Sequence, residues 1–338
     1  MRKDTKSYLE GMNKELSLPQ KNCALAIDLF AGCGGLALGF EAAGIQTIGY
    51  ELDEDSCESY RRNLHATCHC LRLEVGQEFP DNAVVIIGGP PCQPFSANGN
   101  QNGKKDKCDG FPAFLSAVKK CSPQVALFEN VRGMLFQNRH YFDKIVSRLK
   151  GMGYQVQWKL LNAAHYGVPQ RRERLFVVAH HGAFAFPSPT HPSEFVTSGQ
   201  ALSDLLQTIP KNARFLTASM DKYVARYERA SDCVKPRDLH LEKPSRTVTC
   251  RNINGATGDM LRLRLSDGRR RRLTVREAAR LQSFPDWFSF AGSEGSQFRQ
   301  IGNAVPPLMA KAIAIAVRRH LEAAQPVENS NLKPIRAA

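Results

Sequence analysis

One cysteine stands in a setting that suits a nucleophile. Cys92 lies in GGPPCQPFS, residues 88–96, where prolines on both sides stiffen the chain. The residues before it, AVVIIGG, predict a buried strand that runs into a turn. A thiol fixed at the end of a central strand could attack an electrophilic carbon, because a thiolate is a good nucleophile. An ordinary half-buried thiol would fit the same pattern, so other residues of the chain are needed to distinguish a nucleophile from a structural cysteine.

A carboxyl group and three guanidiniums are predicted near this cysteine. Glu129, in QVALFENV at 124–131, ends the next predicted strand. QRRER, residues 170–174, precedes a further strand and contains Arg172 and Arg174. Because strand ends carry the chemistry in a doubly wound sheet, the thiol and the carboxyl could face one pocket. Arginines there could hold a phosphate or a carbonyl oxygen, although a solvated edge and a surface charge run are the alternatives.

A glycine-rich turn predicts a second part of the site. DLFAGCGG, residues 28–35, places three glycines between a predicted strand and a predicted helix, where glycine lets the backbone approach a ligand closely. Glu51 lies about twenty residues on, at the end of the next strand, where an acid can accept hydrogen bonds from ribose hydroxyls. The spacing departs from GxGxxG, so a nucleoside without a pyrophosphate fits as well as a dinucleotide. A purely structural tight turn is the alternative.

The surrounding pattern is that of an α/β protein. Strands alternate with helices up to residue 182, which predicts a parallel sheet with helices on both faces, a Rossmann-like doubly wound fold. Beyond it, to residue 270, the polarity is mixed and prolines are scattered, as in a smaller and largely irregular domain. There LRLRLSDGRRRRL predicts a hairpin around Asp267-Gly268 with arginines on one face. A short helix ended by Pro285 and a closing helix in NAVPPLMAKAIAIAVRRHLEAA follow.

Charge and composition narrow the class of partner. Lys and Arg number 46 against 32 Asp and Glu, a net charge of +14, which favours nucleic acid as a partner over solubility alone. No apolar run reaches the roughly 18 residues of a membrane helix, and the N-terminus lacks the apolar core of a signal peptide. We therefore expect no membrane association, a cytoplasmic location and ten mostly reduced cysteines. HATCHC, residues 65–70, lacks the spaced ligand pairs of a structural zinc site, so no metal is expected.

Six motifs together carry a family resemblance. DLFAGCGG, GGPPCQPFS, ENV, QRRER, LTVREAARLQSFP and QIGNAVPP resemble, in this order, the motifs of bacterial DNA cytosine-5 methyltransferases. The resemblance implies a class I S-adenosylmethionine-dependent methyltransferase fold with a smaller target-recognition domain. The catalytic and cofactor-binding domain would then comprise residues 1–182 and 298–338. Residues 183–297 would form the target-recognition domain and hinge.

The resemblance also implies a role for each candidate residue. Cys92 would add to carbon 6 of cytosine, which makes carbon 5 enamine-like and able to take a methyl group. Glu129 would protonate ring nitrogen 3, and Arg174 would hold the cytosine carbonyl. Arg172 would order the cysteine loop or contact a phosphate. S-adenosylmethionine would be the donor, with Glu51 on its ribose and a pocket lined by Phe30, Ala31, Gly32, Cys33, Gly34, Gly35, Leu52, Pro91, Asn303 and Val305.

The implied substrate is double-stranded DNA, whose target cytosine has to be flipped out of the helix. Gln93, Ser96 and Thr274 resemble DNA-contacting positions, and residues 96–110 resemble a loop that closes over the DNA. A cognate restriction endonuclease acting on the same site could be a partner, and a monomer is expected. One departure concerns the adenine of the cofactor. The family has an Asp at the end of the third strand, where LRLEVG offers Glu74, a poor positional match.

Two other functions compete with this interpretation. The first is an RNA cytosine-5 methyltransferase of similar fold. The eukaryotic tRNA relative usually has Thr where Ser96 stands, and it carries a Cys-Phe-Thr signature that this sequence lacks. The second is a catalytically dead DNA-binding relative, which should have lost Cys92 or Glu129, and both are present. The amino-acid sequence of the recognition region does not reveal which DNA sequence it recognises.

Overall fold

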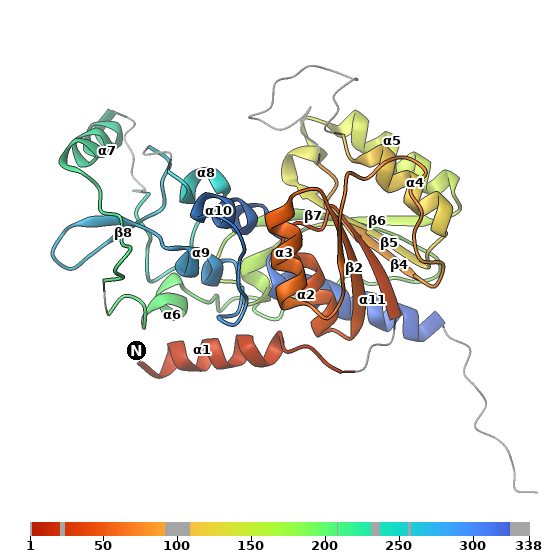
Figure 1. Ribbon diagram of the computed structural model, residues 1–338, viewed down its shortest axis with the longest axis horizontal. Coiled ribbons are helices and arrows are strands. Elements are labelled where there is room, and N and C mark those ends of the chain that lie inside the picture. Colours follow the sequence, from red (N-terminus) through yellow and green to blue (C-terminus); the bar gives the residue numbers. More distant parts are fainter. Residues whose placement is uncertain are drawn as a thin grey trace, which may run out of the picture.

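The molecule is built around one seven-stranded sheet with strand order β3-β2-β1-β4-β5-β7-β6 (Figure 1). The computed structural model describes residues 2–20, 24–91, 109–207, 209–230, 237–255 and 258–324. The strands are β1 (Ala24–Leu29), β2 (Ile45–Glu51), β3 (Cys68–Cys70), β4 (Val85–Gly88), β5 (Val125–Val131), β6 (Gln155–Asn162) and β7 (Glu173–His180). The strands predicted from the sequence are confirmed, and β3 is additional.

The sheet is mixed, so the prediction of a parallel sheet is wrong for β7, which runs against the other six strands. β1 to β5 pair in parallel, whereas β7 lies antiparallel between β5 and β6. The connection explains the difference. Residues 163–172 join β6 to β7 with one short 3₁₀ helix, η4 (Ala163–Tyr166), and a parallel neighbour would need a crossover of about a dozen residues or more. The reversal brings the first residues of β7 to the edge where β5 ends.

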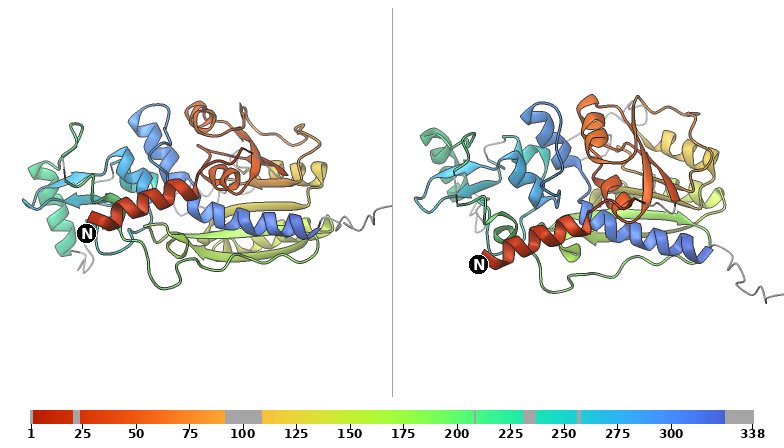
Figure 2. Two further views of the ribbon diagram at one scale, coloured as in Figure 1. Left: turned by 90° about the horizontal axis from the view of Figure 1, so that it is seen from below. Right: turned by 60° about the horizontal axis from the view of Figure 1, so that its bottom comes forward.

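Helices cover both faces of the sheet (Figure 2). On one face α2 (Gly35–Ala42) and α11 (Pro307–Ala324) pack on Val85 and Ile87. On the other, α4 (Phe111–Cys121) and α5 (Arg139–Gly151) pack on Ile86, whose side chain points the opposite way. α2 and α11 approach closely at Gly39, where a Cβ would collide with the backbone of α11. α3 (Glu54–Asn63) follows β2.

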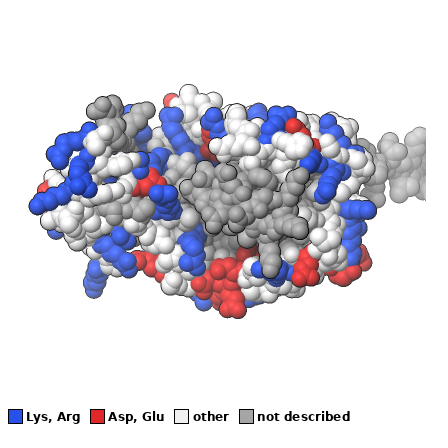
Figure 3. Space-filling view, turned by 90° about the horizontal axis from the view of Figure 1, so that it is seen from above, with Lys and Arg blue, Asp and Glu red and all other residues white. Residues whose placement is uncertain are grey.

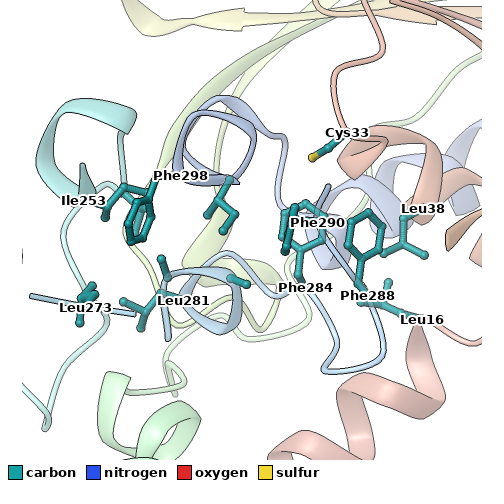
Figure 4. Close-up of a cluster of buried hydrophobic side chains, with 14 of the residues drawn as sticks. Leu16, Cys33, Leu38, Ile253, Leu273, Leu281, Phe284, Phe288, Phe290 and Phe298 are labelled. Atoms are coloured by element: carbon teal, nitrogen blue, oxygen red, sulfur yellow. The ribbon is translucent and has the colours of Figure 1, made fainter. Parts of the chain in front are cut away.

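A second lobe lies on the left in Figure 1. It contains α6 (Ser198–Leu202), α7 (Ala218–Ala230), α8 (Cys250–Ile253), β8 (Arg262–Arg264), β9 (Arg270–Arg272), α9 (Val275–Leu281) and α10 (Glu294–Asn303). A hydrophobic core rich in phenylalanine joins this lobe to the sheet domain. In it Phe284, Phe288 and Phe290 lie beside Leu38 of α2 (Figure 4).

The N-terminal helix α1 (Arg2–Glu15) is an element not predicted from the sequence. Met12 and Leu16 are buried in the core shared by the two lobes, together with Ala201 and Leu202 of α6. At its C-terminal end Glu15 pairs with Lys311 of α11, and the end of α1 lies beside the first turns of that helix (Figure 2). The N-terminal segment therefore spans both lobes.

The arginine hairpin is confirmed, but its charge is largely neutralised within the chain. β8 and β9 pair antiparallel, so Arg262, Arg264 and Arg270 share one face of the hairpin. Asp238 accepts from all three guanidiniums, with distances of 2.8, 3.2 and 3.0 Å to their Nε atoms. On the opposite face Arg271 forms a buried pair with Glu277. Most of this basic cluster is thus committed to holding the second lobe together.

Among the described residues, no single helix is both long and apolar enough to cross a membrane. α10 and α11 taken together have the length and composition of a span, but the chain bends by 41° between them. Both helices contribute buried residues to the cores described above.

Candidate active site

A cavity of about 830 Å³ opens at the edge of the sheet where β1, β2, β4 and β5 end. Thirteen of the residues predicted for the site line it: Phe30, Ala31, Gly32, Cys33, Gly35, Glu51, Leu52, Pro91, Glu129, Arg172, Arg174, Asn303 and Val305. Gly34 and Thr274 do not line it. Cys92, Gln93 and Ser96 lie outside the described residues.

Glu129 and Arg174 form an ion pair inside this cavity. Nε of Arg174 lies 2.8 Å from Oε1 of Glu129, and the two side chains are 13% and 12% exposed. Burial raises the pKa of Glu129, while the charges of Arg174 and Arg172 oppose that rise. The carboxyl is thus kept closer to protonation than an exposed glutamate, yet it has a cation to stabilise its ionised form. A carboxyl poised in this way is suited to give a proton to a base and to take it back.

Arg172 lines the same cavity, and its guanidinium holds backbone carbonyls. Its terminal nitrogens donate to the carbonyl oxygens of Val248, Gly302 and Ala304, at 2.6, 3.1 and 3.0 Å. The side chain is 1% exposed. These contacts tie the start of β7 to two distant chain segments, and they leave few donors for a phosphate. The loop that Arg172 is predicted to order lies outside the described residues.

The glycine turn and Glu51 form the opposite wall of the cavity. The Glu51 carboxylate accepts from the backbone N–H groups of Gly32, Leu52 and Asp53, at 2.9, 2.7 and 2.9 Å. Gly32 has φ 54°, and a Cβ there would meet nothing within 4 Å, so this backbone borders open space. Gly34 serves the turn itself: it has φ 89°, and a Cβ would lie within 3 Å of Tyr60 and Leu64.

The remaining predicted lining residues close the cavity from other segments. Val305 packs directly against the start of α2. The contact requires glycine at position 35, because a Cβ on Gly35 would lie only 2.5 Å from the Val305 carbonyl oxygen. Pro91 packs at Gly110, which also touches the ring of Phe30. Cys33 is buried, with its Sγ 3.8 Å from the Gln300 carbonyl oxygen. Burial raises the pKa of the Cys33 thiol to about 12, so this cysteine is a packing residue rather than a nucleophile.

Asp28 is a site residue that the sequence interpretation missed. It lines the cavity at the end of β1, is 1% exposed, and neither carboxylate oxygen has a hydrogen-bond partner among the described residues. Burial raises its pKa well above the ordinary value, and the nearby charges of Glu51 and Glu41 raise it further. Its place at the head of DLFAGCGG could have suggested it. A buried acid without a partner is costly, which fits a ligand-binding position.

The third strand supplies three further lining residues. Leu71, Arg72 and Leu73 follow β3 directly and border the cavity, whereas Glu74 does not. Glu74, the poor positional match to the family's aspartate, thus does not belong to the cavity lining. At this wall, contacts to the adenine of a cofactor would have to come from apolar side chains, from Arg72 or from the backbone.

Thr274 has a structural task in this conformation. It caps the N-terminus of α9: its hydroxyl accepts from the Glu277 backbone N–H, and the Glu277 carboxylate accepts from the Thr274 backbone N–H. Arg271 binds the same carboxylate with two nitrogens. This arrangement stabilises the helix start by about 1 kcal/mol. A phosphate contact at Thr274 stays a prediction.

The comparison with protein families assigns the chain. The model of the C-5 cytosine-specific DNA methylases matches residues 25–319. The chain belongs to this family. It is a DNA (cytosine-5-)-methyltransferase, and the methylases of this family use S-adenosylmethionine. Five of the six motifs that carried the resemblance contribute residues to the lining of this one cavity, and LTVREAARLQSFP contributes none.

Individual relatives agree with this assignment. The methylase is 57% identical to the type II methyltransferase M.AplI of Arthrospira platensis, across 94% of this chain and 92% of that protein. It is 33% identical to the type II methyltransferase M.NgoFVII of Neisseria gonorrhoeae, across 83% of each. The fold resembles that of the Schizosaccharomyces pombe Dnmt2 methyltransferase, with a TM-score of 0.68, 18% identity and coverage of 89% and 99%. It also resembles Entamoeba histolytica methyltransferase EhMeth, with a TM-score of 0.69, 16% identity and the same coverage.

Proposed function

We propose that this methylase modifies carbon 5 of a flipped-out cytosine in one specific double-stranded DNA sequence, through a covalent bond to Cys92. The observation that carries the proposal is the buried Glu129–Arg174 pair in the cavity at the strand ends. Pro91, the residue before Cys92, lines the same cavity. The nucleophile, the acid and the guanidinium would therefore act on one base.

Side chains of the protein can supply the nucleophile and the acid that this reaction needs. The Cys92 thiolate forms a bond to carbon 6 while Glu129 gives its proton to ring nitrogen 3. The electron pair then available at carbon 5 takes up the donor's methyl group, and the carbon–sulfur bond that held this group breaks, with its electrons left on the sulfur as a neutral thioether. A base afterwards removes the hydrogen on carbon 5, the electrons of that bond restore the ring double bond, the thiolate leaves carbon 6, and nitrogen 3 gives its proton back to Glu129. Arg174 would donate to the exocyclic carbonyl of the base, beside the carboxyl that it already holds.

The residues around the glycine turn fit a nucleoside cofactor. S-adenosylmethionine supplies an electrophilic methyl group when bound. Glu51 would accept from its ribose hydroxyls, and Gly32 leaves the backbone open for close approach. Asp28 has two oxygens in the same cavity that lack a partner among the described residues. Leu52, Asn303 and Val305 would complete the walls.

The names of two relatives and the layout of the chain support a proposal for the biological setting. Two relatives are called type II methyltransferases, so we infer the modification half of a restriction–modification system, or an orphan methylase, acting on DNA in the cytoplasm. A restriction endonuclease for the same site would be its partner, and the methylase would act as a monomer. Residues 183–297 would serve as the target-recognition domain and hinge, and residues 1–182 with 298–338 as the catalytic domain.

A covalent trap tests the proposal. A cytosine with fluorine at carbon 5 has no hydrogen there to lose, so methyl transfer should proceed and elimination should stall. The protein should then stay joined to the DNA in boiling detergent, in the presence of both the methyl donor and the correct site. Cys92→Ser should abolish the adduct, because an alkoxide is far harder to form than a thiolate at neutral pH. An adduct that persists in Cys92→Ser, or maps to another residue, would refute the mechanism.

A substrate comparison separates the competing functions. The wild-type protein should incorporate labelled methyl groups into duplex DNA and leave tRNA unlabelled. Labelled tRNA with unlabelled DNA would favour the RNA methyltransferase. Binding to DNA with no label in either nucleic acid would favour a catalytically dead relative.

A further inference from the structure

A second hollow, of about 630 Å³, lies in the second lobe between α7 and α8. Its walls include Met220, Tyr223 and Tyr227 from α7, and Arg237, Arg251 and Asp259 from the segments opposite. Neither the cofactor nor the reacting base would reach it, because it is separate from the cavity at the sheet edge. Its combination of aromatic faces and guanidiniums has no part in the chemistry described above.

One of its two arginines is fully committed to the protein. Arg237 donates to the Asp259 carboxylate at 2.8 Å, to the Gly258 carbonyl oxygen at 2.9 Å and to the Tyr227 hydroxyl at 2.9 Å. Asp259 also binds Arg246, at 3.0 Å. These bonds build a rigid floor whose charges are paired, so Arg237 holds the hollow in shape and has little capacity left for a ligand.

The other arginine is available to a ligand. Arg251 is exposed, and its guanidinium makes no hydrogen bond or ion pair with any residue that the structure describes. Beside it, Tyr223 is 43% exposed and offers an aromatic wall. The Arg226 guanidinium lies over the ring of Tyr223, 5.8 Å from its centroid. An unpaired guanidinium that shares a hollow with an exposed aromatic ring and a fixed polar floor is suited to a flat ligand that presents hydrogen-bond acceptors.

The position of α8 connects this hollow to the active site. Thr249 and Cys250, at the start of α8, line the cavity that holds Glu129 and Arg174, and the next residue, Arg251, lines the second hollow. One ligand that entered the active site and continued past α8 would therefore reach Arg251. In Figure 1 α7 and α8 lie along the upper side of the molecule, and viewed from that side Lys and Arg side chains surround the second lobe (Figure 3).

The geometry points to Arg251 as a specificity-determining residue, which reads the O6 and N7 atoms of a guanine in the major groove of the recognised DNA sequence. The inference rests on the proposed function, since it takes duplex DNA as the ligand. A guanidinium fork donates two parallel hydrogen bonds to guanine, a pattern that no other base offers in that groove. Tyr223 would pack against the neighbouring base or sugar.

Two variants of Arg251 and one control test this assignment. Arg251→Ala removes the fork, Arg251→Lys keeps the charge without the fork, and Arg229→Ala removes an exposed arginine of α7 that does not line the hollow. Each gene is expressed in cells that lack the activity, and bisulfite sequencing of the host DNA gives the methylated consensus. The recognised sequence thus emerges from the readout itself. Wild-type protein that methylates no DNA would refute the proposed function itself, before any variant is compared.

The expected result is a consensus relaxed at one guanine position, or at its symmetric pair, in one or both Arg251 variants. Discrimination there should fall by about 10- to 100-fold, with the consensus unchanged in Arg229→Ala. A consensus of wild-type strictness in both variants would overturn the assignment, whether or not the rate falls. A uniform fall in methylation at all sites would also overturn it, because that result indicates a phosphate contact. Loss of methylation in both variants would overturn it as well.

Discussion

Glu129 and Arg174 meet diagonally across two antiparallel strands. Glu129 is in register with Phe176 of β7, and Arg174 lies two residues before Phe176. Because residues two apart on a strand point to the same face, both side chains enter the same cavity, and the Nε–Oε1 distance is 2.8 Å. The reversed direction of β7 creates this relationship, since a parallel β7 would begin at the far edge of the sheet. A buried acid and its counter-ion thus reach the site from the end of one strand and the start of the next.

Replacing Glu129 with Gln should slow methylation by roughly 10² to 10⁴ and leave cofactor binding nearly intact. Gln has a similar shape but cannot give a proton to the base. The measurement is single-turnover methyl transfer together with a cofactor titration. Glu173→Gln is a matched control, because Glu173 pairs with Arg132 and is 40% exposed outside the cavity. Wild-type turnover in Glu129→Gln would remove this carboxyl from the mechanism.

Arg172→Ala should destabilise the fold, by about 2–5 kcal/mol, because it leaves three backbone carbonyls without their buried donor. Urea unfolding measures the free energy. Arg171→Ala, at the exposed neighbouring position, should change it by less than about 0.5 kcal/mol. If Arg172→Ala unfolds like the wild type but fails to methylate DNA, the side chain acts on the substrate or the cysteine loop instead.

Asp28 should make stability fall as the pH rises. Its pKa is raised in the folded protein, first by burial and then by Glu51 and Glu41, so the folded state keeps this proton longer than the unfolded state. The stabilisation is complete below the ordinary aspartate pKa and is lost as the pH rises through the raised one. Asp28→Asn does not titrate there. As the pH rises from mildly acidic to neutral, the free energy of unfolding of Asp28→Asn should therefore increase relative to that of the wild type.

Urea unfolding of the cofactor-free protein at several pH values checks the Asp28 prediction. Asp143→Asn, at an exposed carboxylate of α5, is the control and should follow the wild-type curve more closely. Parallel curves for Asp28→Asn and the wild type would show that Asp28 is ionised throughout, so that a partner outside the described residues must hold it.

DNA binding should weaken steeply with salt. With a net charge of +14 and about eight phosphate contacts, the slope of log K against log salt should be near −7. Arg264→Ala should change that slope by less than about one unit, because its guanidinium pairs with Asp238 within the chain. Fluorescence anisotropy over a salt series gives both slopes. A slope near zero in the wild type would argue against nucleic acid as the partner.

Local sequence patterns determined the parts of this protein that depend on neighbouring residues. The apolar runs in β1, β4 and β5 can be buried as strands, and the glycines of DLFAGCGG allow the positive φ values that the first turn needs. The hairpin at Asp267-Gly268 likewise follows from alternation and turn chemistry. The motifs also sufficed to assign the family, because six of them in one order are specific.

Tertiary structure alone decided what depends on distant contacts. The direction of β7 could not be read from its apolar sequence, since a strand buried on both faces looks the same either way along the chain. Arg172 looks like a functional arginine in QRRER, yet its partners lie 76 to 132 residues away. Asp28 looks like an ordinary acid, and only the fold, which buries it with no partner among the described residues, makes it a site residue. Arg251 is one of many arginines in the sequence, and only the packing of the second lobe places it in one hollow with the exposed ring of Tyr223.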